Sequence, residues 1–374
     1  MTMKRKIAFF GVKTFPSRGG TDRVAENLIL QLKDQFEIIV YCFKDPAANN
    51  HIPGVVVKQY SQWVPGAVGS FIYFFFSAMD LYFFTKVDLV HLHKTESTFF
   101  APLFRLRYKV ISTSHEAQYR SDKWNWFAKQ FFYLVERIYI HSSHVCTCIS
   151  RPLSEYYASK YGRPITFIPN GINRIDPAEF NEMGAQSFLP KEADWNKPFV
   201  LFAARRLMSI KGGHTMLEAL QKINYKGQIF ITGDLHTGDE YMERLKKLCL
   251  GLNVFFLGYV NPLPTLLALI HKAELFIFPS ETEGMSIMLL EVASVGTPVV
   301  ASDIPENKQV FNDDEVLFFK SKDADDLAEK LTFALTNREK MKEIGLNCQG
   351  RVFSDYLWSN IAKSYANVYE DVLG

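Results

Sequence analysis

Short apolar runs alternate along the chain with longer amphipathic segments. A run of about five apolar residues predicts a buried strand, and apolar positions three or four residues apart predict a helix. Strands that alternate with such helices are typical of βαβ units and a mostly parallel sheet. In the first half, the pattern predicts strands over residues 6–11, 37–42, 55–58, 89–93, 109–114, 144–150 and 165–169, and helices that include 20–32 and 123–141.

The same pattern occurs again after residues 172–198, a polar stretch without sustained periodicity. The second half has predicted strands over residues 199–203, 228–232, 254–257, 275–279, 298–301 and 316–319. We therefore expect an α/β protein of two doubly wound, Rossmann-like domains, 1–180 and 181–355, followed by a C-terminal helix over 356–374. The carboxyl ends of both sheets would face one cleft, where such folds bind ligands.

Composition narrows the class of protein. A chain of 374 residues is too long for one ordinary core and suits two domains. A net charge of +2 gives no strong basic field, so we expect no nucleic-acid partner. Five dispersed cysteines indicate a reducing, cytoplasmic compartment. The apolar run at the N-terminus is too short for a signal peptide and predicts the first strand instead.

Charged residues follow two predicted strands of the second domain. Arg206 and Lys211 follow the strand over 199–203, and Glu283 lies in the loop after the strand over 275–279. The carboxyl ends of parallel strands share one edge of the sheet, so these side chains should meet there. Two cations at such an edge could neutralise a diphosphate without a metal ion.

A helix is expected to start near Met285, directly after Gly284, and to carry Glu291. Its first N–H groups, at Met285, Ser286 and Ile287, would attract an anion together with the positive end of the helix dipole. Glu291 lies among apolar neighbours, which favours a ligand contact over an exposed helical position.

These residues belong to motifs that occur in one order along the chain. The motifs are PSETEGMSIMLLEVASVGTPVV, Arg206-Leu207 with Lys211-Gly212, Phe256-Leu257-Gly258, Ile168-Pro169-Asn170-Gly171, Gly19-Gly20 and Thr113-Ser114-His115-Glu116. Together they resemble the retaining GT-B glycosyltransferases of family four, whose donors are nucleotide sugars. Residues 115–137 further resemble the bacterial rhamnosyltransferase-like and polysaccharide-assembly members.

The resemblance implies roles for the charged residues. It implies that Arg206 and Lys211 bind the donor diphosphate, although Arg205 could exchange roles with Arg206 and a solvated surface pair is the alternative. Glu283 would lie by the donor sugar, and Glu291 would accept hydrogen bonds from ribose hydroxyls. Met285-Ser286 replaces the Phe-Gly that the family often has after Glu-Gly, which affects the sugar contact rather than the phosphate site.

Other donor contacts are implied in both domains. Gly19 and Gly20 would let the backbone approach the ligand, with a plain tight turn as the alternative. His115 would contact the donor sugar or the acceptor, or else be a capping or core histidine. Backbone groups around residues 258–260, with Tyr259 and Val260, would hold the base. The catalytic set is thus His115, Arg206, Lys211 and Glu283.

The resulting prediction is a metal-independent glycosyltransferase of the hexosyltransferase type, with no cofactor. A nucleoside-diphosphate sugar would be the donor, and a glycan or lipid-linked molecule of bacterial surface polysaccharide assembly would be the acceptor. Two alternatives stay open. One is a GT-B epimerase or hydrolase, for which Glu116 and Glu306 are candidate carboxylates besides Glu283, and the other is a non-catalytic nucleotide-binding scaffold.

A possible metal cluster deserves separate treatment, because His141, His144, Cys146 and Cys148 lie close together in sequence. These ligand types suit zinc, but their spacing is not that of a standard zinc knuckle. We therefore predict no metal site. His91 and His93 are expected at a strand end beside the cleft rather than as metal ligands.

Aromatic residues gather in two segments, residues 67–84 and 123–141, in a chain with 32 phenylalanines. The first is nearly long enough to span a bilayer, but Asp80 lies within it, so a buried or surface-lying helix is expected. The second mixes aromatic with basic residues, as interfacial helices do. We expect either peripheral contact with the inner face of a membrane or packing of both helices on the first sheet.

Overall fold

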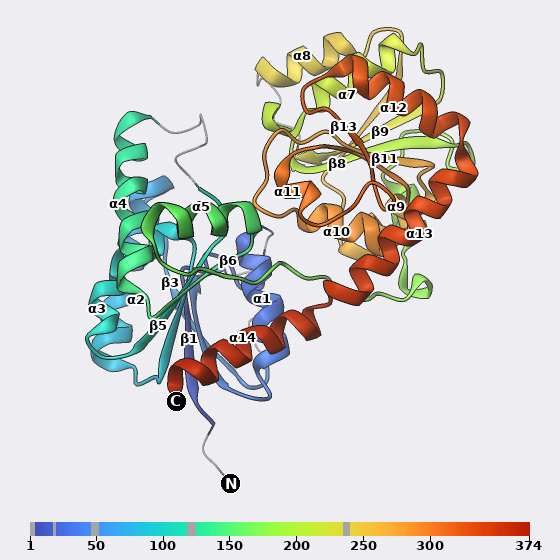
Figure 1. Cartoon of the computed structure of the whole chain (residues 1–374). Coiled ribbons are helices and arrows are strands. Elements are labelled where there is room, and N and C mark those ends of the chain that lie inside the picture. Colours follow the sequence, from blue (N-terminus) through green and yellow to red (C-terminus); the bar gives the residue numbers. More distant parts are fainter. Residues whose placement is uncertain (1–3, 18–19, 46–51, 118–124, 235–239) are drawn as a thin grey trace. The chain divides into compact units, whose positions relative to one another are not determined.

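The computed structural model describes residues 4–17, 20–45, 52–117, 125–234 and 240–374. The chain divides into two compact units, which we treat separately. Unit 1 comprises Met1–Gly171 and Trp358–Gly374, and unit 2 comprises Ile172–Leu357. The chain therefore leaves unit 1 once and returns to it at the end (Figure 1).

Unit 1 is built on a parallel sheet with strand order β3-β2-β1-β4-β5-β6-β7. The strands are β1 (Lys6–Phe10), β2 (Glu37–Phe43), β3 (Val55–Tyr60), β4 (Leu89–His93), β5 (Lys109–Ser114), β6 (Val145–Cys148) and β7 (Thr166–Phe167). The helices are α1 (Thr21–Leu32), α2 (Gly66–Phe84), α3 (Ala101–Arg105), α4 (Trp126–Ser142), α5 (Arg151–Tyr161) and α14 (Trp358–Leu373), with a 3₁₀ helix η1 (Thr95–Phe100) before α3.

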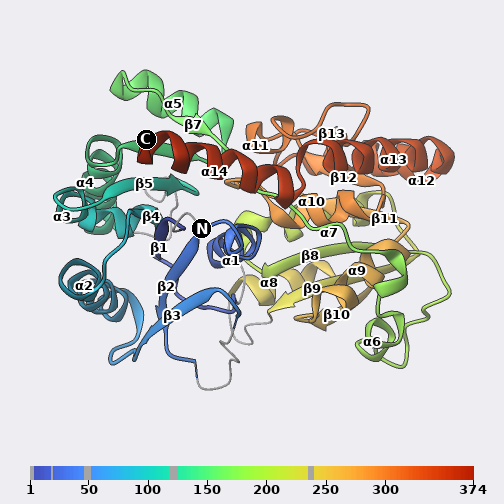
Figure 2. The ribbon, with the colours of Figure 1, turned by 90° about the horizontal axis from the view of Figure 1, so that it is seen from below.

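Alternation of side chains along the strands gives unit 1 two packed faces. On one face, Phe10 packs with Phe74 of α2 and Phe104 of α3. On the other, His91 of β4 hydrogen-bonds to Tyr369 of α14, and α14 contacts α1. Figures 1 and 2 show α2, α3 and α4 grouped on their side of this sheet.

Unit 2 has a second parallel sheet, with strand order β10-β9-β8-β11-β12-β13. Its strands are β8 (Phe199–Arg206), β9 (Gln228–Asp234), β10 (Asn253–Gly258), β11 (Leu275–Phe278), β12 (Val299–Ser302) and β13 (Leu317–Phe319). Its helices are α6 (Glu182–Ser187), α7 (Gly213–Lys222), α8 (Glu240–Leu248), α9 (Leu263–Lys272), α10 (Ile287–Ser294), α11 (Pro305–Lys308), α12 (Ala324–Thr336) and α13 (Arg338–Asp355).

The core of unit 2 follows from its apolar strands. Phe202, Ile231 and Ile277 are buried against apolar residues of α7 and α12, such as Leu217 and Leu331. The predicted α/β class with two Rossmann-like sheets is confirmed. The expected domain limits fall at 180/181 and 355/356, whereas the compact units change at 171/172 and 357/358.

The structure refines three local features. The stretch 172–198 contains the short helix α6 and a 3₁₀ turn, Pro177–Glu179, closed by a capping box from Asp176. The helix expected over 356–374 is α14, which starts at Trp358 and ends at Leu373. Strand β8 extends to Arg206, beyond the predicted end at 203, because Arg206 pairs with Asp234 across a register shift.

Candidate functional site

Two loops of unit 2 are joined at the carboxyl edge of its sheet. Gly212, after β8, has φ +70°, and an added Cβ would lie 1.9 Å from the carbonyl oxygen of Pro279, after β11. Only glycine allows this approach. The N–H of Glu281 also donates to the carbonyl of Ile210 at 2.9 Å. The Lys211-Gly212 sequence therefore holds its loop against the loop that carries Glu283.

Lys211 and Glu283 meet at this junction. The ammonium Nζ lies 2.6 Å from the carboxylate Oε1, and the side chains are 26% and 12% exposed. Arg206 is exposed at the end of β8 and forms no ion pair with any residue that the structure describes. Because Glu283 balances only one of the two cations, the edge carries an uncompensated positive charge that suits an anion.

The start of α10 differs from the prediction. The helix begins at Ile287, and Ser286 is its N-cap, with Oγ accepting the N–H of Leu289 at 3.3 Å. Met285 precedes the helix and is buried. Serine is a favoured N-cap residue, so the helix starts after Ser286, two residues later than predicted. The N–H groups left for an anion are thus those of Ile287 and Met288 rather than Met285 and Ser286.

Glu291 and the β10 loop complete this region. Glu291 lies on α10, about one turn after the helix starts at Ile287, and is 3% exposed. Beyond β10, Tyr259 is exposed and Val260 is buried. Gly258 has φ +72°, and its carbonyl accepts a hydrogen bond from the Thr232 hydroxyl at 2.7 Å.

A second acid at the same edge was missed in the sequence. Glu281 lies 3.1 Å from Lys322 Nζ and 3.6 Å from His214 Nε2. Burial, and then the charge of Arg244, lower the pKa of His214. The signal available was the position of Glu281, which directly follows the strand segment and precedes Glu283 by two residues.

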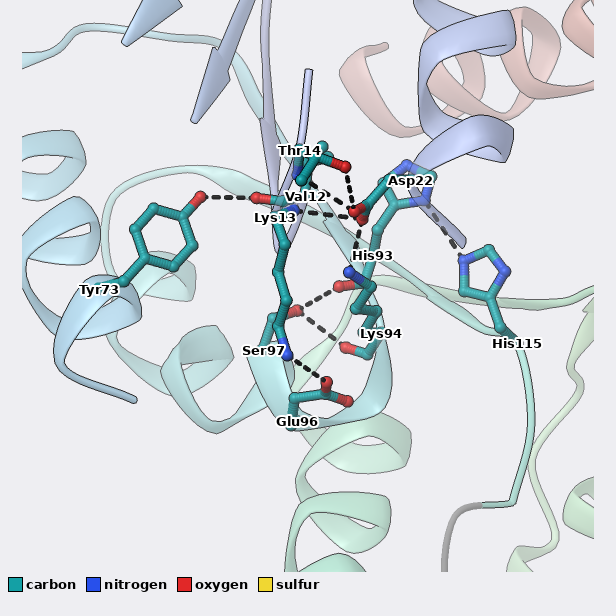
Figure 3. A network of polar contacts seen from close by, with 10 residues as sticks. All are labelled: Val12, Lys13, Thr14, Asp22, Tyr73, His93, Lys94, Glu96, Ser97 and His115. Atoms are coloured by element: carbon teal, nitrogen blue, oxygen red, sulfur yellow. Dashed lines mark hydrogen bonds and ion pairs between the residues drawn. The ribbon is translucent and has the colours of Figure 1, made fainter. Parts of the chain in front are cut away.

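In unit 1, a buried carboxylate organises the carboxyl edge of the sheet (Figure 3). Asp22, in the first turn of α1, accepts the backbone N–H groups of Lys13 at 3.2 Å and Thr14 at 3.1 Å, and the Thr14 hydroxyl at 2.9 Å. Lys94 adds its ammonium at 2.5 Å. The loop after β1 is thereby tied to α1 and to the end of β4.

The surrounding contacts support this network. Lys94 itself has φ +72°, a conformation that non-glycine residues rarely adopt. Ser97 donates to the carbonyls of His93 and Lys94, both at 2.8 Å. A cavity of about 100 Å³ borders the network and is lined by Lys13, Thr21, Lys94, Thr95, Glu96, His115 and Glu116. Sequence reasoning missed Asp22, although an acid in the first turn after Gly19-Gly20 was a visible signal.

The predicted His115 lies in this cavity wall, and three histidines are buried together. His115 Nε2 is 3.4 Å from His93 Nδ1, while His91 contacts Tyr369 at 2.7 Å and Thr113 at 2.6 Å. Burial, followed by His115, lowers the pKa of His91 to about 3. Burial and neighbouring positive groups also hold the pKa values of His93 and His115 well below the usual value. All three are neutral near pH 7.

Gly20 caps the start of α1 with φ +58°, and nothing lies within 4 Å of the position of an added Cβ. Gly19 lies outside the described residues. His91 and His93 lie at the end of β4, as expected, and both are fully buried, with Tyr369 of α14 against His91.

The cysteine and histidine cluster has other partners. The His144 Nδ1 accepts the N–H of Val110 at 3.0 Å, and the Cys146 thiol donates to the carbonyl of Tyr139 at 3.1 Å. Burial raises the pKa of Cys146 to about 11. Among the described residues, no three His, Cys, Asp or Glu side chains are placed to hold a metal ion.

A cavity of about 550 Å³ in unit 2 lies elsewhere. It is bordered by Pro198, Glu274 and Pro298, which precede β8, β11 and β12. It therefore opens at the amino edge of the sheet, where α/β sheets of this kind do not usually bind ligands. The carboxyl edge is the better candidate because Lys211 meets Glu283 there and exposed Arg206 ends strand β8 at the same edge.

A chain of two Rossmann-like units is the architecture of GT-B proteins, and the family comparisons assign it to that class. Residues 18–174 match the family model Glycosyltransferase Family 4, and residues 186–351 match Glycosyl transferases group 1. The chain is a GT-B glycosyltransferase of the group 1 and family 4-like kind, and thus an enzyme of the hexosyltransferase type.

Curated relatives agree with this assignment. The chain is similar to an uncharacterised glycosyltransferase of Methanocaldococcus jannaschii, with 26% identity over 76% of this chain and 75% of that protein. It is 30% identical to phosphatidyl-myo-inositol mannosyltransferase of Mycobacterium leprae over 55% of this chain and 53% of that protein. The match to the mannosyltransferase therefore spans about half of each protein.

Solved structures share the fold. The sucrose-phosphate synthase of Thermosynechococcus elongatus has a TM-score of 0.81 and 21% identity, over 99% of both chains. Anabaena HepE in complex with UDP-glucose has a TM-score of 0.79 and 17% identity, over 98% of this chain and 100% of that chain. At these identities the likeness concerns the fold alone.

Proposed function

We propose that the protein moves a sugar from a nucleoside-diphosphate sugar to a hydroxyl of a glycan or lipid-linked acceptor, with retention of the anomeric configuration. The observation that carries this proposal is the carboxyl edge of unit 2, where the Lys211 ammonium lies 2.6 Å from Glu283 and Arg206 is left exposed. Glu283 pairs with Lys211 and the neighbouring Glu281 pairs with Lys322, so Arg206 is left for the negative charge of a diphosphate.

Each donor part has a candidate partner in unit 2. Arg206 and Lys211 contact the diphosphate, together with the N–H groups of Ile287 and Met288. Glu283, held beside Lys211, accepts hydrogen bonds from the sugar hydroxyls. Glu291, Tyr259 and Val260 belong to the nucleoside end, with Glu291 at the ribose hydroxyls. These assignments follow the family resemblance of the motifs.

The reaction needs stabilisation of a leaving group. The acceptor oxygen bonds to the anomeric carbon on the face from which the nucleoside diphosphate departs, while the bond from that carbon to the β-phosphate oxygen breaks. The proton of the acceptor hydroxyl passes to the departing β-phosphate. Arg206 and Lys211 neutralise the charge that develops there, so the reaction requires no metal ion.

Unit 1 contributes groups for the acceptor side. His115 is neutral near pH 7 because its pKa is lowered, so it offers a hydrogen bond to a sugar without adding charge. Gly19 and Gly20 allow close approach of a ligand to the backbone. The resemblance of residues 115–137 favours a rhamnosyltransferase-like enzyme of bacterial surface polysaccharide assembly, acting at the cytoplasmic side.

Calorimetric titration with UDP, dTDP, GDP and ADP, first without Mg²⁺ and then with it, tests the donor site. We expect one nucleotide to bind without metal and Arg206→Ala to weaken it at least about tenfold, because a charge-assisted contact is lost. Arg205→Ala is the matched control, since Arg205 is the exposed neighbour in the same strand. Weaker binding by Arg205→Ala alone would assign the contact to Arg205, and wild-type affinity in Arg206→Ala would remove Arg206 from the site.

The stereochemistry of transfer needs a separate measurement. Proton NMR of the product, recorded before mutarotation, gives the configuration at the new glycosidic bond. We expect the anomeric configuration of the donor. An inverted centre would exclude the retaining mechanism while leaving the donor site intact.

A further inference from the structure

Helix α2 is apolar on both of its faces, although one face is buried and the other is exposed to solvent. Its inner face packs on the sheet through Tyr73, Phe74, Ala78 and Leu81, all buried. Its outer face consists of apolar side chains three or four residues apart and exposed to solvent, namely Val68, Phe71, Phe75, Phe76 and Phe83. An amphipathic surface helix normally carries polar residues there.

The exposed apolar surface continues beyond α2. The Phe71 ring lies 5.6 Å from that of Phe99 in η1, and Phe99 lies 6.2 Å from Phe131 in α4. Phe127 is one turn before Phe131 and is largely exposed. The term aromatic face denotes the surface made by Trp63, Phe71, Phe75, Phe76, Phe83, Phe99, Trp126 and Phe127. Figure 2 shows α2 and α4 on the same flank of unit 1.

Such a continuous apolar surface is uncommon on a soluble domain and marks an interaction site. Scattered apolar residues would need no explanation. Here Phe71 of α2, Phe99 of η1 and Phe131 of α4 form a chain of ring contacts, and the Trp63 and Phe76 rings lie 5.3 Å apart. The exposed rings are therefore grouped rather than scattered singly.

The chain segments that carry most of the aromatic face expose charges of one sign. Across residues 66–109 and 125–142, the exposed charged side chains are basic, namely Lys86, Arg105, Arg107, Lys109 and Arg137. The acids in these ranges are all engaged by basic groups: Asp80 by Lys58, Asp88 by Arg5, Glu96 by Lys13 and Glu136 by Lys160. The five basic residues form no ion pair with any described residue.

Helix α2 is also the one helix in the described part of the chain that is long and apolar enough to cross a membrane. Its inner face is fixed in unit 1, however. The Tyr73 hydroxyl donates to the carbonyl of Val12 at 2.7 Å, and Asp80 is held by Lys58 at 2.6 Å and by Tyr41 at 2.7 Å. A helix that crossed the bilayer would lose these contacts, whereas a helix that lies on it keeps them.

We propose that the aromatic face seats unit 1 on an anionic phospholipid bilayer, with α2 parallel to the surface. The rings enter the boundary between headgroups and acyl chains, and the surrounding lysines and arginines contact lipid phosphates. Aromatic and basic residues together suit a bilayer interface, because rings can enter the apolar region while lysines and arginines reach the charged headgroups. This inference does not depend on the proposed sugar transfer.

Vesicle co-sedimentation tests the proposal. The full chain is mixed with vesicles of phosphatidylcholine alone, or of equal parts phosphatidylcholine and phosphatidylglycerol, at low and high salt. We expect binding to the anionic vesicles that weakens with salt. A protein that stays in the supernatant with both vesicles, or binds both equally, overturns the proposal.

Paired variants separate the aromatic face from general hydrophobicity. Phe75→Ser with Phe83→Ser removes two rings that are 44% and 60% exposed. The control, Phe333→Ser with Leu346→Ser in unit 2, removes apolar side chains that are 42% and 62% exposed. The first pair should lower vesicle partition about tenfold or more, and the control should leave it unchanged. Equal losses, or no loss, contradict the proposal.

Two further readouts identify the occupant and guard against misfolding. The Phe75→Ser and Phe83→Ser protein should keep the thermal midpoint and nucleotide affinity of the wild type. Nucleotide affinity thus tests the proposed donor site separately from vesicle binding. Sedimentation velocity without lipid should show the same mass for both proteins. A wild-type dimer that this variant abolishes, with no vesicle binding, would assign the aromatic face to a second copy of the chain instead.

Discussion

The carboxyl edges of the two sheets differ in how their charged side chains are paired. In unit 1, Asp22 receives two backbone N–H groups, one hydroxyl and the ammonium of Lys94 within a buried network. In unit 2, Glu283 balances Lys211 while Arg206 stays exposed. The first arrangement uses its charges to fix the path of the chain, and the second keeps positive charge available for a ligand.

This difference is the one expected between charges that stabilise the fold and charges that bind a ligand. A buried carboxylate with several donors loses much stability when it is changed, because its partners are left without compensation. A partly exposed cation contributes little to stability and most to the binding of an anion. The following predictions test whether the two edges differ in this way.

The largest effect is expected from Lys211→Met. The variant should lower kcat/KM by about 10²–10³-fold, because the leaving group loses one of two cations. Unfolding in urea should change by less than about 1 kcal/mol, since the pair is partly exposed. Lys222→Met, which removes a lysine paired with Asp325 at the surface of the same unit, is the control and should leave kinetics unchanged. A large loss of stability in Lys211→Met would make the pair structural.

Asp22→Asn should act on stability instead. The change leaves the Lys94 ammonium buried without its counter-charge, which costs about 2–4 kcal/mol in the free energy of unfolding of unit 1. Nucleotide affinity, measured by calorimetry, should stay within about twofold of wild type if the two edges are independent. Addition of Lys94→Met to Asp22→Asn should recover part of the lost unfolding free energy. If the effects of the two single variants simply add, the two side chains do not stabilise each other.

The buried histidines should make unit 1 sensitive to acid. Their folded pKa values are lowered, to about 3 for His91, so below about pH 6.5 the unfolded chain binds more protons than the folded one. The stability is full above that pH and falls as the pH decreases, by up to about 1.4 kcal/mol per pH unit for each histidine. Urea midpoints measured between neutral and mildly acidic pH give the dependence of stability on pH. His93→Gln should make this dependence weaker. A stability that does not change with pH would contradict the prediction.

The smallest effect compares two helix caps of equal geometry. Ser286 caps α10 and Ser150 caps α5, each with its hydroxyl 3.3 Å from the N–H three residues later. Ser286→Ala and Ser150→Ala should each cost about 1 kcal/mol in urea unfolding. Only Ser286→Ala should also weaken nucleotide binding a few-fold, because α10 starts at the proposed phosphate site. Equal nucleotide affinities would separate α10 from the donor.

Most strands could be predicted because their determinants are local. The apolar runs that predicted β1, β4 and β11 are the buried strands of the structure. The common edge of parallel strands then brought Lys211 and Glu283 together, as expected, although they are distant in sequence. The functional roles of these residues stay predictions.

The errors come from interactions that local patterns do not contain. The start of α10 depends on the hydroxyl of Ser286, and two neighbouring residues are equally plausible starts by periodicity. The burial of His91 depends on Tyr369, which is contributed by the last helix. The role of Asp22 depends on Lys94, which reaches it from the end of another strand.

The return of the chain to unit 1 has a consequence for biosynthesis. Unit 2 is one continuous segment, whereas unit 1 needs α14, whose Tyr365 and Tyr369 cover Thr113 and His91. A ribosome therefore releases all of unit 2 before it supplies the piece that completes unit 1. During that interval the polar side chains of β4 and β5 stay open to water, so nascent unit 1 is the part that chaperones and proteases meet first.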